Sequence, residues 1–105
     1  MSKRRVVVTG LGILSPIGND IQTAWQNALA GVSGIHMVEE FDTTGFTTQF
    51  AGQVKDFDPT AYMPAKEVRK CDLFIQYGIA SGTQAIKDAG LDTANNLDLD
   101  RVGVI

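Results

Sequence analysis

The apolar run VVVTGLGILSPIG, residues 6–18, restricts the fold more than any other segment of the chain. It begins with three contiguous valines, whose branched side chains favour extended backbone. A strand that is covered on both faces needs no alternation of polar and apolar residues, so the run predicts a buried strand over residues 5–14. Ser15 and Pro16 end this strand, because a proline cannot donate a hydrogen bond to a sheet.

Gly10 and Gly12 match the first two positions of the dinucleotide-binding pattern G-x-G-x-x-G. The third position falls on Ser15, and the next helix is predicted to begin only near Asn19. Its N-terminus therefore lies too far along the chain to hold a pyrophosphate placed by the glycines. A dinucleotide-binding domain stays a weak alternative, and the glycines are better explained by a strand that bends and packs closely against a neighbour.

The first helix is predicted over residues 19–29. Asn19 is a favourable N-cap, Gln22 stands three residues later as in a capping box, and Gly31 suits the position just after the helix. Helical spacing gives this segment one apolar face, formed by Ile21, Trp25, Ala28 and Leu29.

The longest predicted helix covers residues 72–89, with Asp72 as its cap and Gly90 at its end. Gly78 and Gly82 lie four residues apart and therefore face the same side. Each glycine costs roughly 0.5–1 kcal/mol relative to alanine in a helix interior. We expect this face to be buried against a sheet or helix whose backbone comes very close.

The segments between and after these helices carry weaker signals. Residues 32–48 are expected to be irregular, and the alternation over residues 50–57 predicts a strand. Asp58, followed by a proline, predicts a short helix that runs to about Met63, and residues 64–69 form another helical turn.

A polar linker, residues 91–100, is followed by the apolar stretch RVGVI, residues 101–105. The stretch predicts the start of a new strand. Because a natural C-terminus seldom falls within a strand, we expect the chain to be part of a longer protein.

Composition excludes several classes of function. A net charge of −3 and a pI near 4.9 argue against a nucleic-acid partner. The chain has no run of about 18 apolar residues, as a membrane span requires, and no continuous apolar signal sequence. Its single cysteine, Cys71, allows no internal disulfide. We therefore expect a cytoplasmic protein without a membrane partner.

Few residues are candidates for chemistry. Cys71 lies near a predicted helix N-terminus, which can activate a thiol, but no histidine is close in sequence and a packing role is favoured. His36 is isolated, so a structural or simply exposed histidine is the better interpretation. Lys66, Arg69 and Lys70 lie three and four residues apart, which places them on one side of a helical turn. A solvated face is the simpler explanation of this cluster, and a docking site for an acidic partner is the functional one.

Five segments stand in a distinctive order and spacing: VVVTGLGILSPIG, NDIQTAWQNALAGVSGI, FAGQVKDFDP, KEVRKCDLFIQYGIASGTQAIKDAGL and RVGVI. Together they resemble the N-terminal portion of β-ketoacyl-acyl carrier protein synthases, and the bacterial type II more than type I. The resemblance extends over the whole chain. It implies that residues 1–105 are the N-terminal part of the synthase N-terminal domain.

The resemblance also implies an α/β, thiolase-like fold and a homodimer. This chain would form the N-terminal part of the first half of a five-layer α/β/α/β/α sandwich, with residues 5–14 as a core strand. The family catalyses a decarboxylating Claisen condensation of an acyl thioester with malonyl-acyl carrier protein, as in fatty acid biosynthesis. Its cysteine nucleophile and two histidines lie beyond position 105. No catalytic residue, cofactor site or metal ligand is therefore expected in this chain.

What the resemblance does assign here is a docking surface. Lys66, Arg69 and Lys70 match the basic residues with which the family meets acidic helix residues of acyl carrier protein. Exposed ion pairs of this kind contribute only about 0.2–1 kcal/mol each. Their larger effect is a faster and salt-sensitive encounter. A small module that binds an acidic partner through the same three residues remains the second hypothesis.

Overall fold

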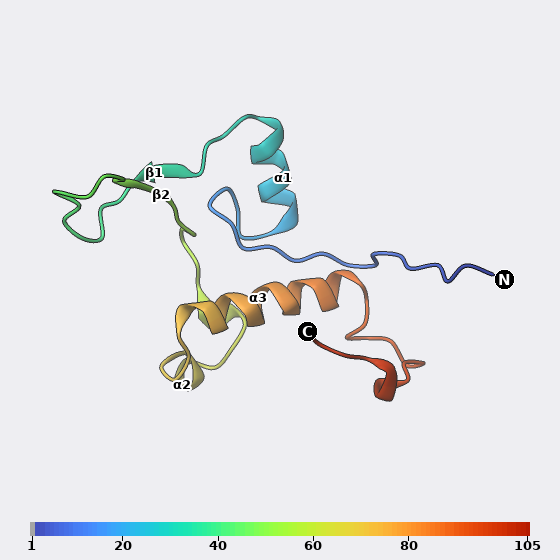
Figure 1. Ribbon diagram of the computed structural model, residues 1–105. Coiled ribbons are helices and arrows are strands. Elements are labelled where there is room, and N and C mark those ends of the chain that lie inside the picture. Colours follow the sequence, from blue (N-terminus) through green and yellow to red (C-terminus); the bar gives the residue numbers. More distant parts are fainter. Residues whose placement is uncertain (1) are drawn as a thin grey trace.

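The chain is arranged around helix α3 (Leu73–Asp88) in the computed structural model, which describes residues 2–105 (Figure 1). The N-terminal segment runs between α3 and α1, and the β1–β2 hairpin extends away from both helices (Figure 1). The remaining elements are α1 (Ile21–Leu29), β1 (Ile35–Met37), β2 (Phe50–Gly52), the 3₁₀ helix η1 (Pro59–Ala61), α2 (Ala65–Val68) and the 3₁₀ helix η2 (Leu99–Arg101).

The N-terminal segment is not a strand, so the prediction for residues 5–14 is wrong. The sheet formed by the described residues has two strands, β1 and β2, and neither pairs with this segment. Val6, Val7 and Val8 are accordingly 71–88% exposed. The reason is that a strand forms only with a partner, and a run of valines specifies extended backbone without supplying one.

Side chains of α3 take the place of a partner strand for part of this segment. The backbone N–H of Leu11 donates to Oδ2 of Asp88 (2.9 Å), and that of Ile13 donates to Oε1 of Gln84 (3.0 Å). These two bonds join residues more than 70 positions apart in sequence. They hold the segment against the C-terminal half of α3.

The glycines of the N-terminal segment pack directly against α3, as predicted. A Cβ atom at Gly12 would overlap the Ser81 carbonyl oxygen and lie 2.9 Å from the Ala85 nitrogen. One at Gly10 would lie 2.6 Å from the Ala89 nitrogen, closer than real Cβ atoms come to a neighbour. Helix α3 fills the space beside both glycines, so helix packing explains why they lack a side chain and a bound pyrophosphate is not needed to explain them.

Helix α1 begins with a different cap from the one predicted. The Asp20 carboxylate accepts hydrogen bonds from the N–H and the hydroxyl of Thr23, at 2.8 and 2.9 Å. Asn19, the predicted cap, instead donates its side-chain amide to the Lys55 carbonyl (2.7 Å). With the cap moved by one residue, Gln22 no longer occupies the capping-box position.

Both long helices end at a glycine in the left-handed region, as predicted. Gly31 follows α1 with φ of 69°, and Gly90 follows α3 with φ of 71°. At the end of α1 the N–H of Val32 donates to the Asn27 carbonyl (2.9 Å), and α3 closes in the same way. This geometry satisfies carbonyls that have no partner within the helix, and it favours glycine because the residue needs a positive φ.

The hairpin is only partly as predicted. The strand expected over residues 50–57 is the shorter β2, and the region expected to be irregular, residues 32–48, contains β1. The two strands pair antiparallel, with Met37 opposite Phe50. Strand β1 has only three residues, all exposed, so its sequence shows no burial pattern from which to predict it.

The two short helices before α3 agree with prediction, whereas the C-terminal segment does not. Asp58 caps η1 by accepting from the Thr60 N–H (3.0 Å), and α2 falls within residues 64–69. Residues 101–105 are not a strand. Arg101 is the last residue of η2, and residues 102–105 have no strand partner among the described residues.

The two glycines of α3, Gly78 and Gly82, face open space. A Cβ atom at either would meet no atom within 4 Å, so the expected close approach of another backbone is absent from residues 2–105. This side of α3 instead borders an open groove of about 700 Å³, whose other wall is formed by Val104 and Ile105.

Little of the chain is buried. Among the described residues, the buried apolar side chains are Ala24, Met63 and Ala80. The radius of gyration is 17.8 Å, whereas a compact chain of this length has about 13 Å. The accessible surface is 8827 Å², against roughly 5,700 Å² for a compact protein of the same mass. The predicted apolar face of α1 therefore stays open, with Trp25 63% exposed.

Within residues 2–105, none of the helices combines the length and the apolar character that a membrane crossing needs.

We predict that Gly12→Ala detaches the N-terminal segment from α3, because the new methyl group overlaps the Ser81 carbonyl. Overpacking of this kind costs about 1–3 kcal/mol. Hydrogen exchange at the Leu11 and Ile13 amides should therefore accelerate on the order of ten- to hundredfold. Gly103→Ala is the control, since a Cβ there meets no atom within 4 Å. Unchanged protection in Gly12→Ala would show that the contact is not needed.

We predict that the Asp20 cap is lost in acid. Hydrogen bonds from the N–H and hydroxyl of Thr23 lower the pKa of Asp20 below its ordinary value of 3.8. A lowered pKa means that the cap stabilises α1 fully above about pH 4 and ceases to do so as the pH falls through the folded-state pKa. The Thr23 amide shift should report this titration by NMR. Asp20→Asn should keep the cap and abolish the titration, and a midpoint above 3.8 would contradict the assignment.

Candidate functional site

Three cations stand together where α2 leads into α3. Lys66 lies in α2, and Arg69 follows one turn later with helical backbone angles (φ −67°, ψ −18°), which puts both on one side. Lys70 continues the turn through a bond from its N–H to the Glu67 carbonyl (3.0 Å). All three cationic residues are exposed. We refer to residues 66–70 as the basic turn.

One acidic residue lies within the basic turn. Oε1 of Glu67 is 3.9 Å from Nζ of Lys70, and the two side chains are 45% and 72% exposed. Such surface pairs are held weakly and are screened by salt. Lys70 therefore remains available to an anionic partner, as do Lys66 and Arg69, for which no ion pair is found within the described residues.

A buried glutamine of α3 holds the backbone of the basic turn. Gln76 is 7% exposed, and its Nε2 donates to the Cys71 carbonyl (2.9 Å) and to the Val68 carbonyl (3.3 Å). Val68 and Cys71 are the residues immediately before and after Arg69 and Lys70. One amide group therefore ties both ends of this dipeptide to α3.

Aromatic rings connect the segment before α2 to α3. Phe57 stacks on Tyr62 with ring centroids 6.2 Å apart, and it meets the edge of Tyr77 at 5.2 Å. Tyr62 also accepts a hydrogen bond at its hydroxyl from Nε2 of Gln84 (2.9 Å). The segment that precedes α2 is thus attached to α3 through rings and through an amide.

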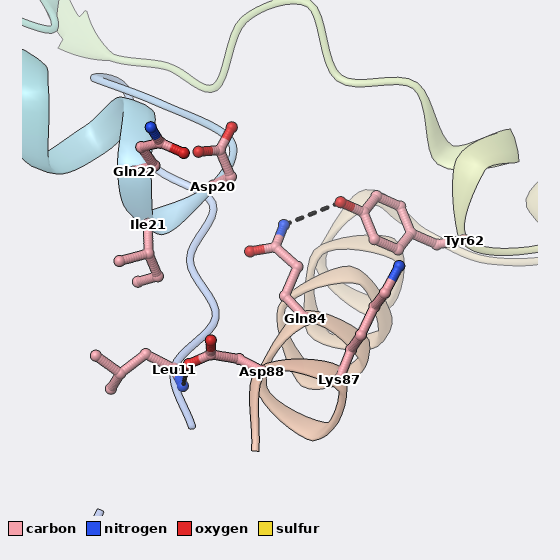
Figure 2. A pocket seen from close by; sticks show the side chains of 8 residues that line it. All are labelled: Leu11, Asp20, Ile21, Gln22, Tyr62, Gln84, Lys87 and Asp88. Carbon is pink, nitrogen blue, oxygen red and sulfur yellow. Dashed lines mark hydrogen bonds between the residues drawn. The ribbon is translucent and has the colours of Figure 1, made fainter. Parts of the chain in front are cut away.

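An open cavity of about 470 Å³ lies between the start of α1 and the C-terminal half of α3 (Figure 2). Gln84 stands at its centre in Figure 2, with Tyr62 and Lys87 on one side and Asp88 below. Its Nε2 also donates to the Asn19 carbonyl (2.6 Å), so this residue links three segments of the chain. The cavity is lined by Leu11, Asp20, Ile21, Gln22, Tyr62, Gln84, Lys87 and Asp88. No cysteine or histidine is among them, and the hydrogen bonds of Gln84 and Asp88 here hold the N-terminal segment, Asn19 and Tyr62 against α3.

Cys71 and His36, the two residues that the sequence raised as candidates for chemistry, lie outside this cavity. Cys71 is a half-buried free thiol that follows the basic turn, and its carbonyl oxygen accepts the bond from Gln76. His36 is an exposed residue of β1 opposite Ala51. Residues 2–105 also contain no group of three or more histidine, cysteine or acidic side chains placed to hold a metal.

The two glutamines that hold other segments against α3 were not among the residues predicted from the sequence. Gln76 and Gln84 are eight residues apart with Ala80 midway, so the three share one stripe of α3. Ala80 is fully buried. Two amides flanking a small residue on one helix stripe were a signal for buried hydrogen bonds, but their partners could not be named without the fold.

Residues 3–105 match the family described as "Beta-ketoacyl synthase, N-terminal domain". Because this match takes in nearly all of the chain, the protein belongs to the β-ketoacyl synthase family.

Curated relatives that carry the name of one particular enzyme are similar to this chain over nearly its whole length. The chain is 59% identical over 104 residues to "3-oxoacyl-[acyl-carrier-protein] synthase 2" of Vibrio cholerae and 47% identical to the protein of the same description from Coxiella burnetii. Each match covers 99% of this chain and 25% of the relative. The chain thus spans about a quarter of the length of these curated relatives.

A solved structure described as "The ishigamide ketosynthase/chain length factor" resembles this chain with a TM-score of 0.72 and 33% identity. The match covers 97% of this chain and 24% of the other. The open arrangement around α3 is therefore the fold of one part of a ketosynthase.

Proposed function

We propose that residues 1–105 form the N-terminal part of the β-ketoacyl synthase N-terminal domain in a type II β-ketoacyl-acyl carrier protein synthase of fatty acid biosynthesis. The identity of 59% to the Vibrio cholerae synthase, over 99% of this chain, is the observation that carries the proposal. The whole enzyme would have the thiolase-like five-layer sandwich and act as a cytoplasmic homodimer. The exposed valines and the open groove of α3 support this fold, since they are surfaces that further layers would cover.

The reaction of such an enzyme is a decarboxylating condensation. An acyl group passes from the carrier-protein thioester to an enzyme cysteine, which releases the carrier thiol. Malonyl-acyl carrier protein then loses CO₂, and the resulting carbanion attacks the acyl carbonyl carbon. The enzyme thiol leaves, and the product is a 3-oxoacyl thioester two carbons longer than the starting acyl chain. By family resemblance the nucleophile and its histidines lie beyond position 105, so this chain contributes support and docking.

We assign the carrier-protein docking surface to Lys66, Arg69 and Lys70. Their exposure, their common side of the turn and the weakness of the one internal ion pair support this assignment. The cluster is a local concentration of positive charge in a chain with net charge −3. It would attract the acidic helix of a carrier protein and orient it during encounter.

The activity is tested by incubating the intact protein with acyl- and malonyl-acyl carrier protein. We expect CO₂ release in equal amount to a 3-oxoacyl-acyl carrier protein that mass spectrometry finds extended by two carbons. Binding of the carrier protein without product would instead favour the small module for an acidic partner. Absence of both would overturn the proposal.

The docking assignment predicts that Arg69→Glu/Lys70→Glu raises KM for carrier-protein substrates while kcat changes little. Two exposed pairs at about 0.2–1 kcal/mol each correspond to a rise of roughly two- to thirtyfold. The rise should shrink as salt is added, because exposed charges are screened. Lys3→Glu/Arg4→Glu makes the same change in net charge at another exposed site and serves as the control. Equal effects of the two double variants would contradict a specific docking surface.

A further inference from the structure

We propose that Gln76 is a positioning residue for carrier-protein docking, an inference that rests on the function proposed above. Gln76 touches no substrate in this proposal. It acts through the backbone of Arg69 and Lys70, the dipeptide whose flanking carbonyls it holds at 3.3 and 2.9 Å.

Burial of the Gln76 amide has to be compensated by hydrogen bonds. It is the one polar side chain among the described residues that is buried, at 7% exposure. A buried amide without partners is costly, and here both bonds of Nε2 go to the same turn. Conformations of the turn that break these bonds would leave the buried amide unpaired, and they are therefore higher in free energy.

The basic turn has few other restraints on its backbone. Helix α2 has only four residues and no side-chain cap at its N-terminus. Asp72, the cap of α3, makes no side-chain capping bond either. Backbone bonds from the N–H groups of Lys70 and Cys71 complete the turn, the second at 3.3 Å. Two short, uncapped junctions would leave the cations mobile if the amide of Gln76 were absent.

Docking of a carrier protein requires the cationic side chains of the basic turn to become ordered. Lys and Arg have long, flexible side chains, and ordering them on binding has an entropic cost. A fixed backbone limits that cost, because only side-chain torsions remain to be ordered. Gln76 thus affects affinity for the carrier protein without carrying charge itself.

The test uses Gln76→Met in the intact enzyme, a change that keeps side-chain length and removes the donor. We expect KM for carrier-protein substrates to rise about three- to tenfold. Both kcat and the KM for the same acyl and malonyl groups carried on coenzyme A should stay within about twofold of wild type. Coenzyme A presents the thioester without a protein surface, so a general loss of structure would affect both substrate forms.

Gln84→Met is the matched control, since Gln84 is the other structural glutamine of α3 but has no bond to the basic turn. It should leave the ratio of the two KM values unchanged. Hydrogen exchange at the Lys70 and Cys71 amides should accelerate in Gln76→Met and not in Gln84→Met. If Gln76→Met does not accumulate in folded form, Gln76→Asn withdraws the same amide by one methylene and takes its place.

A double-mutant cycle separates this inference from the function on which it rests. In an Arg69→Ala/Lys70→Ala background, Gln76→Met should have no further effect on carrier-protein KM, because the groups that it positions are gone. An additive effect, an equal rise with coenzyme A substrates or unchanged amide exchange would overturn the role of Gln76. If Arg69→Ala/Lys70→Ala itself leaves KM unchanged, the docking surface is wrong and the positioning role falls with it.

Discussion

The attachment of the N-terminal segment to α3 is the interaction on which the positions of residues 10–19 and of Tyr62 beside this helix depend. An extended segment without a partner strand leaves its N–H groups unpaired, and such groups are costly away from water. Asp88 and Gln84 satisfy two of them, and the absence of a Cβ at Gly10 and Gly12 lets the two backbones approach closely enough for this to happen. Gln84 then uses its other end to hold Asn19 and Tyr62, so one side chain sets the positions of three segments relative to α3.

The features that the sequence predicted correctly are those decided by neighbouring residues. Gly31 and Gly90 end helices because a positive φ is needed within one turn of the last helical residue. Asp58 caps η1 for a similarly local reason. The choice of Asn19 over Asp20 as the cap of α1 was wrong, because both residue types are suitable and only the contact of Asn19 with Lys55 distinguishes them.

The predictions that were wrong concern features that need a partner distant in sequence. Residues 5–14 and 101–105 have the composition of strands, but pairing depends on a second segment that composition cannot identify. Strand β1 is the opposite case, a strand that was present but not predicted. It forms by pairing with β2, and its three residues have no alternating pattern of their own. The candidate site likewise has a part that could be predicted from the sequence and a part that could not. The spacing of Lys66, Arg69 and Lys70 was readable from the chain, whereas the carbonyl partners of Gln76 became known only when α2 was placed beside α3.

The scarcity of buried apolar side chains has a thermodynamic consequence. The heat-capacity increment of unfolding arises mainly from newly hydrated apolar surface and is about 12–15 cal/mol/K per residue in globular domains. With Ala24, Met63 and Ala80 as its buried apolar residues, the described part of the chain has little such surface to expose. Calorimetry of these residues alone should therefore give a small increment and a broad, weakly cooperative melting curve. Such a curve is typical of a polypeptide segment whose structure depends on packing against other segments.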